Sequence, residues 1–462
     1  MACSPAFPPL RSFAGPMYTK LSRWGLTPLL GLLLLGCGSG TSDDQAGTAA
    51  AAGETAQLPA ADPDNGGLTL PAGFSAYIVA DDLGQARHLT VAPNGALYVA
   101  LRATKQGGGI VALRDTDGDG RADVTERFGE HGGTGIAVHG DHLYFSSNVA
   151  LYRYPLSPGQ LAPQGGPETI ISGFPEQKSH AAKAFAFDGK GHVYVNVGAP
   201  SNACMEEART KGSPGQNPCP QLEKHGGIWR FRADQTGQTQ QEHGQRYATG
   251  IRNVVALDWN EADQHLYVVQ HGRDQLHEFW PDRFTPEQSA ELPAEEFMRV
   301  REGDNFGWPY CYFDQQQNRR VQAPEYGGDG QQVGPCAQYQ RPLVAFPGHW
   351  APNDLLFYTG NHLPDRYRNG AFVVFHGSWN RHVGGQEGYQ VVFVPFNGSD
   401  PAGDWEKFAD GFTGKQDLDA PGQAEHRPMG IAQGPDGTLY ISDSQKGRIW
   451  RVMYTGEAQA AR

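Results

Sequence analysis

The stretch ARHLTVAPNGALYVAL, residues 86–101, decides the fold of this chain. Two short runs that alternate apolar and polar residues flank a Pro-Asn-Gly tip. Alternation with a period of two is typical of a half-buried strand, and a tip rich in turn-forming residues reverses the chain. The stretch therefore predicts a β-hairpin.

The same hairpin pattern returns along the chain. It recurs in TGIAVHGDHLYFSS (134–147), KAFAFDGKGHVYVNVG (183–198), NVVALDWNEADQHLYVVQHG (253–272) and MGIAQGPDGTLYISDS (429–444). A divergent sixth unit is expected within 340–396, around AFVVFHGSWN and YQVVFVPF. Helical periodicity is confined to short segments such as 287–298. Repeated units with Gly-rich turns predict an all-β, six-bladed β-propeller, with seven blades as the alternative. The long loops should gather on one face and build the functional site.

The N-terminal region indicates export. LTPLLGLLLLGCGSG (26–40) has the length of a signal peptide and is too short to span a bilayer. Its end, Leu34 to Cys37, resembles the lipobox of bacterial lipoproteins, in which the cysteine is acylated. We therefore expect a signal peptide at 1–36, a flexible tether at 37–67 that starts at lipidated Cys37, and the propeller at 68–456. Gly38 favours the outer membrane, facing the bacterial periplasm.

Charge and cysteine content agree with this location. The formal net charge of −13 argues against nucleic acid and against an anionic membrane surface as partners. Apart from Cys3 and Cys37, four cysteines fall as two local pairs in loop-like stretches. In an oxidising compartment, the economical pairing among the three possible ones is Cys204 with Cys219 and Cys311 with Cys336. The close C-x2-C spacing of a zinc site and the C-x-x-C-H of a c-type haem are both absent.

Several motifs then occur in a specific order: RDTDGDGRAD, VGAPSNAC, YATGIRN, HGRDQL, GDNFGWPYC, FHGSWNR and HRPMGIAQGPDGTLYISD. Together they resemble, over about residues 70–454, the glucose/sorbosone dehydrogenases. These are soluble aldose dehydrogenases that depend on pyrroloquinoline quinone (PQQ), and the sorbosone dehydrogenase-like branch is the most similar.

The resemblance implies that PQQ lies over the central channel and is held by a calcium ion. The implied reaction is oxidation of an aldose or sorbosone-like sugar, with the electrons passing to a separate acceptor such as a cytochrome c or a quinone. Contact with the membrane would be through the lipid anchor alone. The alternatives are a non-catalytic periplasmic binding propeller and a calcium-dependent lactonase-like hydrolase.

His180 is the candidate catalytic base. On its own, the stretch EQKSHAAKAFAF favours an ordinary surface histidine. The resemblance reverses that interpretation, because in the family a histidine just before such a strand takes the proton of the sugar hydroxyl. PQQ has three carboxylates, and arginine suits their recognition. The resemblance assigns this role to Arg252, Asn253, Arg427, Arg381 and, on the loop of His180, Lys183. The glucose-oxidising relatives carry Arg-Asn-Pro-Gln where this chain has Val254 and Val255 after Arg252 and Asn253, which argues against glucose itself.

Calcium is implied at two places. HGRD (271–274) matches the segment that coordinates the PQQ-bound calcium, here through the carbonyls of Gly272 and Arg273 with Asp274 nearby. Separately, DTDGDGRADVTE (115–126) fits the pattern of an EF-hand loop. Its candidate ligands are Asp115, Asp117, Asp119, Asp123 and Glu126. No flanking helices are evident, so the alternative is a solvated Asp-Gly turn between two strands.

Overall fold

The computed structural model describes residues 58–381 and 383–456. The predicted signal peptide, Cys37 and most of the tether lie outside this range. Within the described part, no helix is long and apolar enough to cross a membrane.

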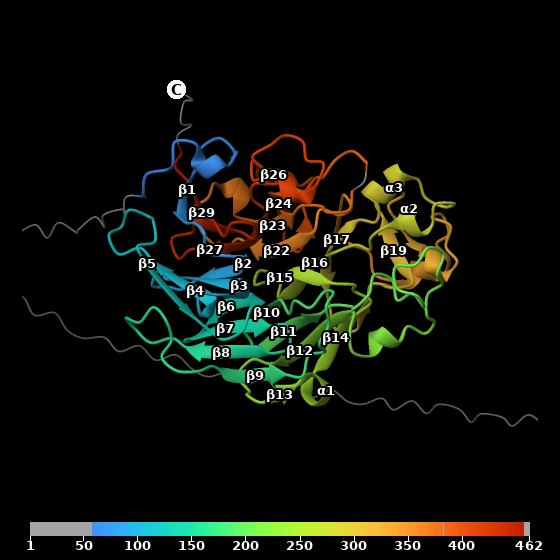
Figure 1. Ribbon diagram of the computed structural model, residues 1–462, viewed down its shortest axis with the longest axis horizontal. Helices are drawn as coiled ribbons and strands as arrows, with labels where there is room; N and C mark the ends of the chain where they lie inside the picture. The colour runs from blue at the N-terminus through green and yellow to red at the C-terminus, as the bar shows by residue number, and fades with distance from the viewer. Residues whose placement is uncertain (1–57, 382, 457–462) are drawn as a thin grey trace, which may run out of the picture. The chain divides into compact units, whose positions relative to one another are not determined.

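Six sheets follow one another along the chain and surround a common centre (Figure 1). Blade 1 contains β2 (Ala86–Val91), β3 (Leu97–Lys105), β4 (Gly108–Arg114) and β5 (Val124–Phe128). Blade 2 contains β6 (Gly133–His139), β7 (His142–Ser147), β8 (Leu151–Pro155), β9 (Glu168–Ser172) and the added β13 (Gln238–Thr239). Blade 3 contains β10 (Phe185–Phe187), β11 (His192–Val197), β12 (Gly227–Arg232), β14 (Gln245–Thr249) and the added β18 (Asp304–Asn305). The strands of the six sheets pair antiparallel, except that the added strands β13 and β18 pair parallel with β9 and β14.

The second half of the chain supplies the remaining blades. Blade 4 contains β15 (Val254–Asn260), β16 (His265–Gln270), β17 (Glu295–Val300) and β21 (Val344–Phe346). Blade 5 contains β22 (Pro352–Phe357), β23 (Gly370–His376), β24 (Tyr389–Asn397), β25 (Asp400–Pro401) and β26 (Glu406–Ala409). Blade 6 contains β27 (Pro428–Gln433), β28 (Leu439–Asp443), β29 (Ile449–Tyr454) and β1 (Phe74–Ala80). The prediction of a six-bladed propeller is confirmed.

Blade 6 combines strands from opposite ends of the domain. Strand β1 pairs antiparallel with β29, with Phe74 opposite Tyr454 and Ala76 opposite Val452. The inner strand β2 of blade 1 contacts the inner strands β6 and β27 on either side. The ring is therefore closed by hydrogen bonds between segments far apart in the sequence.

The predicted hairpins form the first two strands of five blades, and the divergent unit forms most of blade 5. Its two apolar runs are β23 and β24, preceded by β22. One local expectation was wrong. Of the segment 287–298, only the first part is helical, in α3 (Pro286–Glu291), because Leu292 ends the helix and β17 begins at Glu295. Glu295 and Glu296 favour a helix by their intrinsic propensity. Both lie on β17 instead, because β17 pairs with β16.

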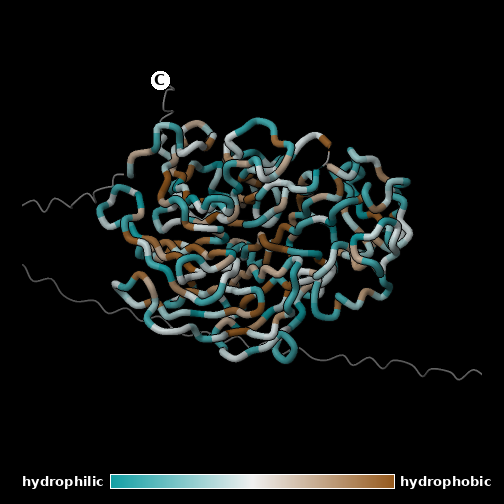
Figure 2. Tube along the Cα trace, in the orientation of Figure 1, coloured by the Kyte–Doolittle hydropathy of each residue, from teal (hydrophilic) through white to brown (hydrophobic). Residues whose placement is uncertain are grey.

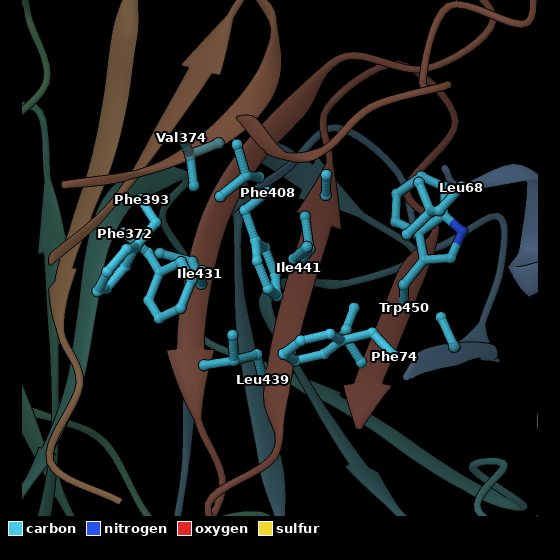
Figure 3. Close-up of a cluster of buried hydrophobic side chains, with 14 of the residues drawn as sticks. Leu68, Phe74, Phe372, Val374, Phe393, Phe408, Ile431, Leu439, Ile441 and Trp450 are labelled. Atoms are coloured by element: carbon cyan, nitrogen blue, oxygen red, sulfur yellow. The ribbon is translucent and has the colours of Figure 1, made fainter. Parts of the chain in front are cut away.

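The apolar core lies between successive blades. Figure 2 shows the hydrophobic colouring concentrated on the strands and the hydrophilic colouring on the outer loops. Figure 3 shows one such layer, in which Phe372 and Phe393 of blade 5 lie beside Ile431 of blade 6, whereas Trp450 lies at the other side of the layer, beside Leu68. Each fully buried side chain of this size contributes about 2–3 kcal/mol through the hydrophobic effect.

Polar side chains connect the inner strands of neighbouring blades. An inner strand has no strand partner on its axial side, so some of its N–H groups need side-chain acceptors. Asp258 Oδ2 of blade 4 accepts from Phe357 N of blade 5 at 2.8 Å, and Asp354 Oδ2 of blade 5 accepts from Ile431 N of blade 6 at 2.8 Å. These interactions, which we call blade latches, fix the angle between adjacent sheets.

Long insertions extend from blades 3 and 4. They include α1 (Gln240–His243), α2 (Leu276–Phe279), α3 and the hairpin of β19 (Cys311–Asp314) with β20 (Arg319–Gln322). Both predicted disulfides, Cys204–Cys219 and Cys311–Cys336, are formed in these insertions.

Candidate active site

The candidate site lies at one end of the propeller. Neighbouring strands are antiparallel, so the starts of the inner strands and the ends of the second strands meet on the same face. Arg252 precedes β15, Arg427 precedes β27, His271 follows β16 and His376 ends β23. His180 lies in the connection that leads into β10. The fold therefore brings residues from four blades to one place.

His180 has the geometry of a proton acceptor. Its Nδ1 lies 2.5 Å from the carbonyl oxygen of Ala199, which can only accept. Nδ1 therefore carries the hydrogen, and the lone pair of the neutral ring is on Nε2. Burial, together with the positive charge of Arg252, lowers the pKa of His180 to about 3. The ring is thus neutral at working pH.

The loop that carries His180 is held by Gln177. Gln177 Nε2 lies 2.8 Å from the carbonyl oxygen of Ser179 and 2.9 Å from those of His180 and Gly198. His180 itself has a positive φ of 54°, a conformation that is unfavourable for a residue with a Cβ. These hydrogen bonds offset the backbone strain and fix the direction of the imidazole.

Arg252 and Asp274 form the buried centre of the site. Arg252 is 3% exposed and donates from Nη2 to Asp274 Oδ2 at 2.9 Å and from Nη1 to the Gly272 carbonyl at 2.8 Å. Asp274 also accepts from Arg209 at Oδ2 and from Asn380 at Oδ1, each at 2.9 Å. Burial alone would raise the pKa of Asp274, but Arg252 and other cations hold it well below its usual range. Both carboxylate oxygens already have protein donors, so Asp274 orients Arg252.

The HGRD segment offers carbonyl oxygens to a cation. Glu295 Oε2 accepts from Gly272 N at 2.8 Å and fixes the peptide plane there. The Arg273 side chain turns away into a buried ion pair with Glu325, whereas its carbonyl receives no hydrogen bond from the described residues. Nearby, Asn380 Oδ1 is buried and has no partner in the described chain. An oxygen-lined site with unused acceptors fits a calcium ion.

Three arginines with no carboxylate partner among the described residues lie close enough to His376 to lower its pKa, together with its burial. Arg427 donates to the carbonyls of His376 and Gly377 at 3.1 and 2.7 Å, and Arg87 donates from Nε to Thr134 Oγ1 at 3.2 Å. Burial, together with the nearby Arg102, lowers the pKa of Arg87 to about 9. We call Arg87, Arg102 and Arg427 the cationic cluster. It fits an anionic ligand with several carboxylates.

Two members of the cationic cluster, Arg87 and Arg102, were missed from the sequence. Arg87 lies on β2 and Arg102 on β3. In the sequence, each looks like an ordinary polar residue of a strand that alternates polar and apolar residues. Asn202 was also missed; its Oδ1 accepts from Arg252 Nη2 at 2.9 Å and from Asp274 N at 2.8 Å. Asn202 lies in the motif VGAPSNAC, two residues before Cys204. Its position beside the predicted disulfide loop is the feature of the sequence that could have identified it.

Two of the predicted cofactor residues are buried and hydrogen-bonded within the protein. Arg381 is buried, and it donates to the Ala290 carbonyl at 2.8 Å and to Glu291 at 2.7 Å, so it joins the site loop to α3. Lys183 is also buried, and its Nζ donates to the Ala181 carbonyl at 2.6 Å. Burial lowers the pKa of Lys183 to about 8. The geometry of both residues favours structural roles. Asn253, by contrast, lies at the site, with Nδ2 3.4 Å from His271 Nδ1.

The EF-hand-like loop lies between β4 and β5, without flanking helices. Carboxylate oxygens of Asp115, Asp117 and Asp123 lie within 4.8 Å of one another, and all three residues are exposed. Asp119 is not part of this group, and Glu126 lies on β5. Asp115 accepts from the backbone N–H groups of Gly118 and Gly120 at 2.7 and 2.8 Å. This geometry is compatible with both the calcium loop and the Asp-Gly turn, and calcium here stays a prediction.

Fold and site together define a six-bladed propeller that presents on one face a neutral histidine, a cationic cluster and the Arg273 carbonyl, which has no hydrogen bond from the described residues. The chain belongs to the TrAA12-like family, whose model matches residues 68–455.

Solved structures have the same fold. The PQQ domain of pyranose dehydrogenase from Coprinopsis cinerea, in its holo form, is 20% identical and superposes with a TM-score of 0.64 over 87% of this chain and 99% of that one. A calcium structure of the Trichoderma reesei carbohydrate-active enzyme of family AA12 is 17% identical, with a TM-score of 0.68 over 84% and 97%. The soluble aldose sugar dehydrogenase of Escherichia coli, in its apo form, is 16% identical, with a TM-score of 0.53 over 82% and 99%.

The resemblance to the PQQ sugar dehydrogenases is thus confirmed at the level of the fold, whereas the sorbosone dehydrogenase-like branch stays a prediction. Among curated proteins, an uncharacterized protein of Borreliella burgdorferi is 27% identical over 209 residues, which is 45% of this chain and 48% of the relative. The matched region therefore spans about half the length of that relative.

Proposed function

We propose that this protein is a PQQ-dependent sugar dehydrogenase that oxidises an aldose or a sorbosone-like sugar. The observation that carries the proposal is that a proton acceptor and a set of cations lie close together. Among the described residues, a histidine whose Nε2 has no hydrogen-bond partner and a set of guanidinium groups without carboxylate partners occur at the same end of a propeller. Relatives of the same fold include a PQQ domain in its holo form and aldose sugar dehydrogenases, which supports the same chemistry here.

When bound, PQQ would supply a quinone that accepts a hydride from the sugar carbon. Arg427 and Arg87 would each pair with a carboxylate of the cofactor, since both lack an ion-pair partner among the described residues. The carbonyl oxygens of Gly272 and Arg273 would hold the calcium ion. Arg252 would stay bound to Asp274 and would donate its remaining N–H to the cofactor.

His180 would act on the substrate. Its Nε2 takes the proton of the sugar hydroxyl, while the hydrogen on Nδ1 stays bound to the Ala199 carbonyl. The imidazolium formed in this step sits near Arg252, which opposes it. An anionic cofactor in the cationic cluster would offset that repulsion and raise the basicity of His180 toward the working pH.

The remaining parts of the proposal concern location and partners. The electrons would leave to a separate periplasmic acceptor, a cytochrome c or a quinone. The protein would be held at the outer membrane by a lipid on Cys37, which lies outside the described residues. Val254 and Val255 replace polar groups of the glucose-oxidising relatives, so the substrate would be a sugar other than glucose.

The test is His180→Gln in protein loaded with PQQ and calcium. The cofactor should remain bound, as followed by the quinone absorbance, because no cofactor contact is removed. Sugar-dependent dye reduction should fall by about 10²–10⁴-fold, the usual contribution of a general base. Near-normal turnover in the loaded variant would refute the assignment. Failure of the wild-type protein to bind PQQ with calcium present would favour the non-catalytic binding propeller.

A further inference from the structure

The insertions contain a groove that is separate from the candidate active site, because none of the residues assigned to that site lines it. A groove with a volume of about 540 Å³ is lined by Tyr310, Tyr326, Tyr339, Asn217, Gln322 and Glu325. We call it the tyrosine groove. Ligand pockets for small molecules usually measure about 300–1,000 Å³, so the groove is large enough for one or two sugar rings.

Two of the tyrosine rings, Tyr310 and Tyr326, are held in place before any ligand arrives. The hydroxyl of Tyr326 donates to the carbonyls of Ala203 and Gln216, each at 3.3 Å. The hydroxyl of Tyr310 accepts from Cys219 N at 2.9 Å. The two rings stand edge to face, with centroids 4.8 Å apart and an interplanar angle of 67°. Their faces therefore have fixed directions.

Both disulfides brace this arrangement. Tyr310 reaches Cys219, which is bonded to Cys204, and the backbone N–H of Tyr339 donates to the Cys336 carbonyl at 3.3 Å. Cys336 is in turn bonded to Cys311. A preformed aromatic surface loses little conformational entropy when a ligand binds, which favours affinity.

The groove presents no unpaired charge. Its one charged lining residue, Glu325, is buried and accepts from Arg273 Nη1 at 2.6 and 2.5 Å and from Trp280 Nε1 at 3.1 Å. The other polar groups of the groove are the tyrosine hydroxyls and the side-chain amides of Asn217 and Gln322. Such a lining excludes ions and suits a neutral ligand that has apolar ring faces and hydroxyl edges.

We propose that the tyrosine groove binds a neutral carbohydrate chain. A pyranose ring has C–H groups on its faces, which pack on tyrosine rings, and hydroxyls at its rim, which hydrogen-bond to amides. The ion pair between Glu325 and Arg273 connects the groove to the HGRD segment, so a bound chain lies beside the loops of the candidate active site. This inference concerns binding alone and does not depend on the proposed oxidation.

The test is isothermal titration of the wild-type protein with maltohexaose, cellohexaose and xylohexaose. We expect saturable binding of at least one of these neutral hexasaccharides. Tyr339→Ala should weaken that binding at least about tenfold, as loss of a central aromatic contact usually does. Tyr152→Ala, on β8 of blade 2, is the matched control and should bind normally. Asn217→Ala, at an exposed position, is the second groove variant if Tyr339→Ala does not fold.

Three results would overturn the inference. They are no saturable binding of any of the three sugars, equal binding by wild type and by the groove variant, or equally tight binding of hexagalacturonate, which carries a charge on every ring. Binding that persists in His180→Gln supports the inference even when turnover is lost. Failure of the groove and failure of the oxidation proposal are therefore distinguishable.

Discussion

Asp258→Asn should change how stability depends on pH. Asp258 forms the blade latch between blades 4 and 5, where Oδ2 accepts from Phe357 N and Oδ1 from Trp259 N, each at 2.8 Å. Burial raises the pKa of this carboxyl to about 7, although the two N–H donors act in the opposite direction. In the unfolded chain the pKa of an aspartate is about 3.9.

An acid whose folded pKa is raised stabilises the fold fully below its unfolded pKa. That contribution is lost as the pH rises through the folded value. The span from about 3.9 to about 7, at 1.36 kcal/mol per pH unit, corresponds to roughly 4 kcal/mol as a ceiling. An asparagine cannot ionise, and its amide accepts from one of the two N–H groups only. The variant should therefore be less stable than wild type by about 1–3 kcal/mol at pH 5 and recover most of that difference by pH 8.

The assay is urea unfolding of wild type and Asp258→Asn at half-unit steps from pH 5 to pH 8. The difference between the two proteins isolates Asp258, because every other titrating group is common to both. Asp404→Asn, at an exposed position, is the control and should show a constant difference. A difference between wild type and Asp258→Asn that stays the same across this range would refute the reasoning.

Three further predictions concern the cofactor and the insertions. Arg427→Ala should weaken PQQ binding about 10–100-fold in the presence of calcium, because a carboxylate loses a charged donor; titration followed by quinone absorbance measures this. Arg381→Ala should instead lower the unfolding free energy and leave PQQ affinity unchanged, and the reverse outcome would restore Arg381 as a cofactor residue. Replacing Cys311 and Cys336 by alanine opens a loop with a sequence separation of 25 and should lower the unfolding free energy by about 3.5 kcal/mol. An unchanged melting temperature would contradict that figure.

The sequence predicts those parts of this protein that local pattern determines. The hairpin at 86–101 repeats because each blade needs two alternating strands with a tight turn, so the blade number and the strands near the centre could be read directly. The pairing of β1 with β29 could not be predicted, because the alternating pattern of Phe74–Ala80 does not specify which distant strand it pairs with. The direction in which a side chain points could not be predicted from the sequence either. Arg381 and Arg427 look alike in their motifs, yet one is paired with Glu291 and the other has no carboxylate partner in the described chain.

The closure of blade 6 has a consequence for how the protein folds. The hydrogen bonds between β1 and β29 join residues separated by most of the domain, and contacts of this kind slow folding because a very long loop must close first. Until β29 has been synthesised, blade 6 lacks a strand, and the unpaired edges on both sides of the gap are open to other chains. A chain in which only five blades have formed is therefore prone to aggregate. A chaperone that retains the chain until its last strand is available would raise the yield of folded protein.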